Sequence, residues 1–112
     1  MIMVIIHMKV SNKNSKELSQ TITSLLNCIR TAKGCARCDF FYGLEDENVL
    51  CLLEEWDSQI NLEKHRNSDC FKVLRGAMNL LEEPCEIISC RSFQPAGELQ
   101  YNCLEILKND QL

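Results

Sequence analysis

Glu54-Glu55-Trp56-Asp57-Ser58 is the stretch that decides the fold of this 112-residue chain. The apolar run from Val49 to Leu53 precedes it and predicts a strand that leads directly into the acidic pair and the tryptophan. Asp57 or Ser58 can cap a helix that follows, because a short side-chain oxygen accepts hydrogen bonds from the free N–H groups of a first turn. We therefore expect a strand over residues 49–56 and a helix directly after it.

A second helix start lies ten residues further along the chain. Ser68 can cap it, and apolar side chains follow at spacings of three, four and three residues: Phe71, Leu74, Met78 and Leu81. The region from 57 to 83 is thus predicted to be helical with a break near Asn67-Ser68, and Pro84 is expected to stop it.

The first half of the chain predicts a strand, a helix and another strand. The strand at about 3–10 is apolar on both faces, which is typical of a central strand. Asn14 or Ser15 can cap the helix, and Gly34 is expected to end it. The helix is indicated by apolar residues at helical spacing, Leu18, Ile22, Leu25, Leu26 and Ile29.

Two further strands, at about 36–42 and 85–93, complete a β-α-β-β-α-β order. This is the ferredoxin-like α+β arrangement with an antiparallel sheet. We expect one domain over residues 1–94 and a C-terminal tail over 95–112 that packs on the domain or on a dimer partner. A short helix in this tail would align four apolar residues, Leu99, Cys103, Leu104 and Leu107.

Composition excludes several classes of protein. The net charge is −4 and the Lys and Arg residues are scattered, so no basic stripe for nucleic acid is expected. No segment approaches the roughly 20 apolar residues of a membrane span, and the N-terminus lacks a positive region and a cleavage site. We expect a soluble, cytoplasmic protein. The eight cysteines are then expected to be reduced and to act mostly as small hydrophobes.

The layout of Glu55-Trp56, a helix with His65, and then Ser68 and Phe71 resembles the antibiotic biosynthesis monooxygenase family. The resemblance covers about residues 3–92. It implies a dimeric α+β barrel, in which two subunits pack sheet against sheet and each keeps a small pocket between sheet and helices. The best-known members oxidise phenols, quinols or anthrones with dioxygen, without metal, flavin or haem. The resemblance therefore implies a homodimeric monooxygenase that uses no cofactor and acts on a small aromatic molecule.

Two other functions on the same scaffold stay open. One is a non-catalytic module that binds a small ligand or a partner, and the other is an isomerase or decarboxylase of a small metabolite. The family also has a haem-degrading branch. By position, Arg75 stands where that branch has its haem-ligating histidine, so haem oxygenation is not expected here.

Five residues are candidates for the site. His65 and His7 are the candidate general bases, since histidine titrates near neutral pH. The alternative for His65 is a half-buried histidine that pins its helix, and His7 either lines the same pocket or fills the core or an interface. Trp56, Tyr42 and Phe71 are candidate substrate contacts, as aromatic walls or, for Tyr42, a hydrogen-bond donor.

The spacing Cys35-Ala36-Arg37-Cys38 is compatible with a redox or zinc site. Here, however, the pair follows a helix and enters a strand, where residues three apart face opposite sides. A reactive pair instead gains acidity from a helix N-terminus. The sequence has no second such pair to complete four zinc ligands. We therefore expect neither a metal nor a cofactor.

Overall fold

The computed structural model describes the backbone of residues 1–93 and 100–108 and the side chains of residues 1–91. The elements follow the order β1 (Ile2–Lys9), α1 (Asn12–Arg30), β2 (Cys35–Tyr42), β3 (Val49–Trp56), α2 (Gln59–Arg66), α3 (Asp69–Ala77), η1 (Met78–Leu80), β4 (Glu86–Phe93) and β5 (Gln100–Lys108). Up to β4 this is the predicted ferredoxin-like order, with the second helical region divided as expected. The α+β fold class is confirmed.

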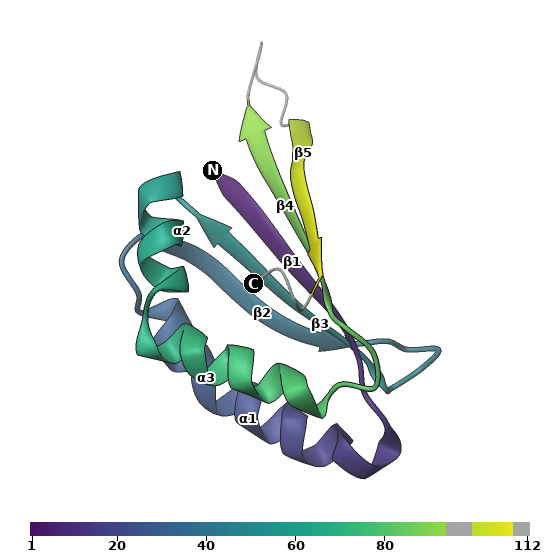
Figure 1. Cartoon of the computed structure of the whole chain (residues 1–112). Coiled ribbons are helices and arrows are strands. Elements are labelled where there is room, and N and C mark those ends of the chain that lie inside the picture. Colours follow the sequence, from purple (N-terminus) through teal and green to yellow (C-terminus); the bar gives the residue numbers. More distant parts are fainter. Residues whose placement is uncertain (94–99, 109–112) are drawn as a thin grey trace.

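The strands form one antiparallel sheet in the order β2-β3-β1-β4-β5. Figure 1 shows α1, α2 and α3 together on one face of this sheet, while no helix of the described residues covers the other, helix-free face. β1 lies between β3 and β4, which confirms the central strand predicted from its apolar faces.

The tail contains a strand rather than the short helix that its apolar spacing suggested. Gln100–Lys108 is β5 and pairs with β4 at the edge of the sheet. A segment of nine residues is too short to distinguish the 3.6-residue period of a helix from the two-residue period of a strand. In addition, the edge of β4 offers free backbone donors and acceptors to a further strand. Leu99 and residues 109–112 lie outside the described part of the chain.

The buried residues of α1 are those that its spacing predicted: Leu18, Ile22, Leu25 and Ile29, with Leu26 partly buried. The predicted cap was wrong, because α1 already begins at Asn12, after Ser11. Asn14 instead donates from Nδ2 to the carbonyl oxygen of Leu80, 3.2 Å away, and so holds the helix start against η1.

Gly34 does not cap α1, which ends at Arg30 with Thr31 as its C-cap. Gly34 lies in the turn before β2, where its φ of +89° favours glycine. A Cβ there would also come within 2.6 Å of the side chains of Asn61 and Asp57. The position therefore requires glycine for two reasons: its positive φ, and the lack of room for a Cβ atom.

Both serine caps of the second helical region are confirmed. Ser58 accepts a hydrogen bond from the backbone N–H of Asn61, and Ser68 accepts one from that of Phe71. The region ends earlier than Pro84 implied, because α3 tightens into η1 and Leu81 forms a β-bridge with Val10.

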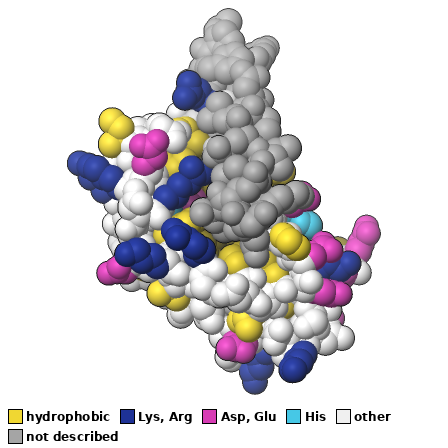
Figure 2. Space-filling model, in the orientation of Figure 1, with side chains coloured by type: hydrophobic (Ala, Val, Ile, Leu, Met, Phe, Trp, Pro, Cys, Tyr) yellow, Lys and Arg dark blue, Asp and Glu magenta, His cyan; other side chains and the backbone are white. Residues whose placement is uncertain are grey.

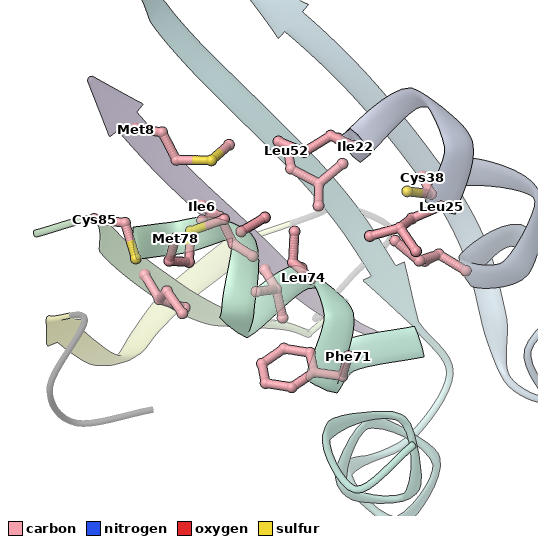
Figure 3. Packing of buried hydrophobic residues seen from close by; sticks show 14 of the residues in the cluster. Ile6, Met8, Ile22, Leu25, Cys38, Leu52, Phe71, Leu74, Met78 and Cys85 are labelled. Carbon is pink, nitrogen blue, oxygen red and sulfur yellow. The ribbon is translucent and has the colours of Figure 1, made fainter. Parts of the chain in front are cut away.

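The core lies between the helices and one face of the sheet. Figure 3 shows Met78 of η1 and Leu74 of α3 near Ile6 of β1, with Leu52 of β3 close to Ile22 of α1. Burial of apolar side chains on this scale is the main stabilising contribution to such a domain. On the described surface in Figure 2, acidic and basic side chains are interspersed, with hydrophobic side chains between them. In the described residues, no helix has the length and apolar character needed to cross a membrane.

Candidate functional site

The site is formed by the last residues of β3 that face the helices and by the two helices that follow this strand, α2 and α3. Alternate residues of β3 point toward the helices and are buried, the last of them being Leu52, Glu54 and Trp56. Glu54 therefore occupies an inward position in an otherwise apolar row and is only 2% exposed. A carboxyl group is costly to bury without partners, so its surroundings identify it as a functional candidate.

Trp56 is completely buried and fixes one oxygen of Glu54. Its indole Nε1 donates a hydrogen bond to Glu54 Oε1 over 2.8 Å. The ring stacks on His65, with centroids 4.6 Å apart and an interplanar angle of 26°. Phe71 meets the same imidazole edge-on at 5.5 Å. The histidine is thus held between two aromatic rings, which confines its orientation.

His65 and Glu54 face each other within this aromatic enclosure. The imidazole Nε2 lies 3.8 Å from Glu54 Oε1, and each side chain is 2% exposed. Within the described part of the chain, neither His65 Nε2 nor Glu54 Oε2 has a hydrogen-bond partner. Buried polar atoms are nearly always paired. Two buried polar atoms without a partner on neighbouring side chains mark this pair as a candidate for acid–base chemistry.

Burial changes the acid–base properties of both groups. It raises the pKa of Glu54 to about 7, against the opposing effects of the Trp56 hydrogen bond and the positive charge of Arg66. It also lowers the pKa of His65 to about 4, and Arg66 adds to this shift. The expectation of an ordinary histidine that titrates near neutrality is therefore wrong. Near pH 7 it is Glu54 that changes charge, while the imidazole is neutral.

A hollow of about 410 Å³ opens beside His65. It lies between the end of α1 and the junction of α2 with α3, and its wall includes Cys28, Ala32, Asn61, His65 and Cys70. Glu54 does not line it. The imidazole consequently separates the buried carboxyl group from the hollow.

The α1–β2 turn holds one side of this hollow in place. Asp57 donates its backbone N–H to the carbonyl oxygen of Gly34 over 2.9 Å. Its side chain accepts a hydrogen bond from Asn61 Nδ2, also over 2.9 Å. These contacts tie the start of α2 to the turn, so the position of the hollow wall depends on the glycine described above.

The structure does not bring His7 and His65 together. His7 lies on β1 between the inward-facing residues Ile6 and Met8, so its exposed side chain is on the helix-free face. Its neighbours across the sheet are Cys51 of β3 and Glu86 of β4. A pocket shared by the two histidines within one chain is therefore excluded by the parity of the strand.

Two aromatic candidates have different surroundings. Phe71 is 6% exposed and contributes a core face as well as its contact with His65. Tyr42 is 69% exposed and lies at the far end of β2, where it lines a separate hollow of about 240 Å³ with Phe40 and Phe41. Tyr42 pairs with Leu50, six residues before Trp56 on β3. That is about 20 Å along the strand.

The cysteine pair Cys35 and Cys38 straddles a β-bulge at the start of β2. Burial and the nearby Glu54 raise the pKa of both thiols, to about 12 for Cys38. A raised pKa disfavours the reactive thiolate. Among the described residues, no three or more His, Cys, Asp or Glu side chains cluster as metal ligands.

Glu54 is the site residue that the sequence analysis missed. The acidic pair was interpreted as the end of a strand, and Glu55 was linked to the family pattern. The signal was nevertheless present, because the period of two along β3 places Glu54, not Glu55, on the face of Leu52 and Trp56.

Solved structures of other proteins share this fold. A conserved protein from Methanosarcina mazei Go1 is 27% identical with a TM-score of 0.77, over 80% of this chain and 90% of its own. Rv0793 from Mycobacterium tuberculosis is 22% identical with a TM-score of 0.78, over 85% and 97%. A crystal structure described as that of an antibiotic biosynthesis monooxygenase is 16% identical with a TM-score of 0.77, over 83% and 99%. The last two similarities concern the fold alone.

A comparison with curated proteins finds no match. The sequence profile of the family described as antibiotic biosynthesis monooxygenase matches residues 1–76, which span β1 to α3 and include Glu54, Trp56 and His65. The chain therefore belongs to the antibiotic biosynthesis monooxygenase family.

Proposed function

We propose that this protein is a monooxygenase that oxidises a small aromatic quinol or phenol with dioxygen and without a cofactor. Membership of the family supports a monooxygenase-like role. The observation that carries the proposal is the buried pair of Glu54 and His65, each with one unpaired polar atom in the described part of the chain, together with the hollow of about 410 Å³ that His65 lines. This volume is within the range of cavities that accept small organic molecules.

The chemistry needs a proton acceptor and a dry, oriented site. Loss of the hydroxyl proton makes the aromatic ring electron-rich, and the ring then passes one electron to dioxygen. The resulting radical pair forms a carbon–oxygen bond, and cleavage of the O–O bond releases water. For a quinol the products are a hydroxyquinone and one water, so that both oxygen atoms of dioxygen and all electrons are accounted for. In this proposal His65 receives the hydroxyl proton.

The aromatic enclosure supports this role for His65. Trp56 and Phe71 keep water away from the imidazole, which strengthens electrostatic interactions in the site. A neutral imidazole is also the form that can accept a proton, and burial keeps His65 neutral around pH 7. This neutral form supports the proposed role of His65 as a base, which a protonated histidine could not fill.

The second candidate function is a non-catalytic module for a small aromatic ligand. It is favoured by one observation, namely that the side chain of His65 is only 2% exposed although it lines the hollow. A ligand in the hollow would then touch mainly the helix residues at its rim. Such a module would bind the same aromatic molecules without consuming oxygen.

Oxygen uptake separates the two functions. The chain should consume dioxygen with members of a panel of quinols and anthrones, with one product molecule per oxygen molecule. A matched reaction with the corresponding methyl ethers, which have no hydroxyl proton to lose, should show no uptake. Binding of quinols without oxygen uptake across the panel would favour the non-catalytic module instead.

We further propose that the helix-free face of the sheet pairs with a second copy of the chain. Half-buried apolar side chains lie on it, including Ile5, Cys51, Leu53 and Ile88. An apolar patch of this kind is typical of an association surface. Sedimentation at micromolar concentration should show one species at twice the 12.9 kDa of one chain. A well-folded monomer under these conditions would contradict the proposal.

A further inference from the structure

We propose that Glu54 is a positioning residue that acts through His65, as the buried carboxylate behind the imidazole that stabilises the proton His65 takes from a ligand hydroxyl. The inference rests on the function proposed above and adds a residue to its site. It assigns the acid–base chemistry to a pair of side chains rather than to a single histidine.

The geometry places the two groups in series. His65 lines the hollow and Glu54 does not, while His65 Nε2 faces Glu54 Oε1 at 3.8 Å. Trp56 occupies Oε1 with its N–H, which leaves Oε2 without a partner in the described part of the chain. A carboxylate in this position can orient an imidazole and stabilise its protonated form, as in other acid–histidine pairs.

The groups around Glu54 explain why it, rather than His65, responds near neutral pH. Val4 of β1, which lies opposite Glu54, is apolar. The titratable and charged groups that act on Glu54 or respond to its charge come from β2, α2 and α3: Cys35, Cys38, His65, Arg66 and Cys70. Arg66 is the positive charge in this set that lowers the pKa of Glu54, and burial outweighs it. The thiols, whose pKa values are raised, contribute no negative charge near pH 7.

The direction of the effect follows from charge. Below the pKa of Glu54 the carboxyl is neutral and gives an imidazolium little stabilisation. Above it the carboxylate stabilises the imidazolium strongly, since an opposite charge at this range raises the pKa of histidine by about 1–3 units. When His65 takes a proton, the O–H bond of the ligand breaks and an N–H bond forms, while Glu54 stays ionised. The basicity of His65 should therefore increase as the pH rises through about 7.

Trp56 provides a direct probe of the pair. It is the single tryptophan of the chain, it stacks on His65 and it donates a hydrogen bond to Glu54. Tryptophan fluorescence of the wild type should show a transition near pH 7. The variant Glu54→Gln, which keeps the shape and an acceptor for the indole N–H, should lose it. Glu55→Gln is the matched control, because Glu55 lies on the opposite face of the same strand, and it should retain the transition.

A phenol tests the transfer of the proton. 4-Cyanophenol is suitable because its phenolate absorbs at a longer wavelength than the phenol. At pH 7.5 the wild type and Glu55→Gln should raise the phenolate fraction of the bound molecule, and Glu54→Gln should lower its ratio to bound phenol by about tenfold or more. Matching far-ultraviolet circular dichroism spectra of the three proteins will show that the fold is unchanged.

The outcomes separate this inference from the proposed function. A fluorescence transition near pH 7 that persists in Glu54→Gln would overturn the role of Glu54, even if oxygen uptake is found. The same holds if all three proteins give equal phenolate fractions. A transition that depends on Glu54, in a protein that binds no phenol or quinol, would support the buried pair and overturn the aromatic substrate.

Discussion

The two faces of the sheet place the two histidines of this chain in opposite surroundings. On the helix-covered face, His65 is 4% exposed and lies between Trp56 and Phe71, next to Glu54. On the helix-free face, His7 is exposed on β1. The imidazole of His65 is thus enclosed by aromatic rings, whereas that of His7 is accessible to solvent.

The difference between the two surroundings comes from strand parity and helix cover, not from residue type. Glu54 and Glu55 repeat the comparison one residue apart. Glu54 is buried against the helices, whereas Glu55 is half-buried on the other face, with Arg37 3.8 Å from its carboxylate. Two residues of the same type on opposite faces of the sheet can therefore be substituted in parallel, with one serving as the control for the other.

The largest difference between the faces should be in turnover. Removal of a general base typically lowers the rate by ~100- to 10,000-fold. We therefore expect His65→Gln to lose quinol-dependent oxygen uptake to this extent and to keep its melting temperature. His7→Gln is the control on the other face and should retain the activity. Equal rates in the wild type and His65→Gln would remove His65 from the mechanism and direct attention to His7.

The next difference should be in stability. Leu52 is fully buried beneath the helices, whereas its neighbour Leu53 is half-buried on the helix-free face. Leu52→Ala should lower the free energy of unfolding by about 2–5 kcal/mol, because it leaves a cavity in a packed core. Leu53→Ala should mainly weaken the association of two chains. Urea unfolding at several protein concentrations measures both effects, and a concentration dependence changed by Leu52→Ala alone would contradict this division.

The pH dependence of stability should reveal the buried pair through two opposite slopes. The pKa of Glu54 rises from an ordinary 4.5 to about 7 on folding. The stability that this group contributes is therefore lost as the pH rises through this window. The pKa of His65 falls from 6.5 to about 4, so stability is lost as the pH decreases through that window. Each shift corresponds to about 3 kcal/mol.

In the wild type these slopes should largely cancel between pH 4.5 and 6.5. His65→Gln should lose stability by about 3 kcal/mol between pH 4.5 and 7, and Glu54→Gln should gain a similar amount between pH 4 and 6.5. Chemical denaturation across this range provides the measurement, with Glu55→Gln as control. Slopes of the same sign in both variants would show that the two groups do not titrate as an opposed pair.

Much of the fold was predictable because local signals and tertiary structure agree. β3 has the predicted bounds, and the capping serines Ser58 and Ser68 act as expected. The start of α1 was wrong because Asn14, a good cap by residue type, is used in a contact with Leu80, which is distant in the sequence. β5 was not predicted because the tail forms a strand by pairing with β4, a tertiary contact that the local sequence of the tail does not reveal.

The site was predictable only in part. Trp56 and His65 were identified from the family pattern, and their stacking agrees with a shared site. The role of Glu54 depends on its depth in the core and on its distance from His65, neither of which a single sequence contains. The pKa values likewise depend on burial, which reverses the simple expectation that the histidine is the group that titrates near pH 7.

The most direct test of this account is the ionisation of Glu54 itself. Carbon-13 NMR of protein labelled at the glutamate carboxyl carbons can follow each side chain with pH, and the spectrum of Glu54→Gln assigns the resonance by its loss. The account predicts a midpoint near pH 7 for Glu54, with a simultaneous shift of the His65 ring signals. A midpoint near the ordinary value of 4.5, or a His65 spectrum unaffected by this ionisation, would contradict the buried acid–base pair.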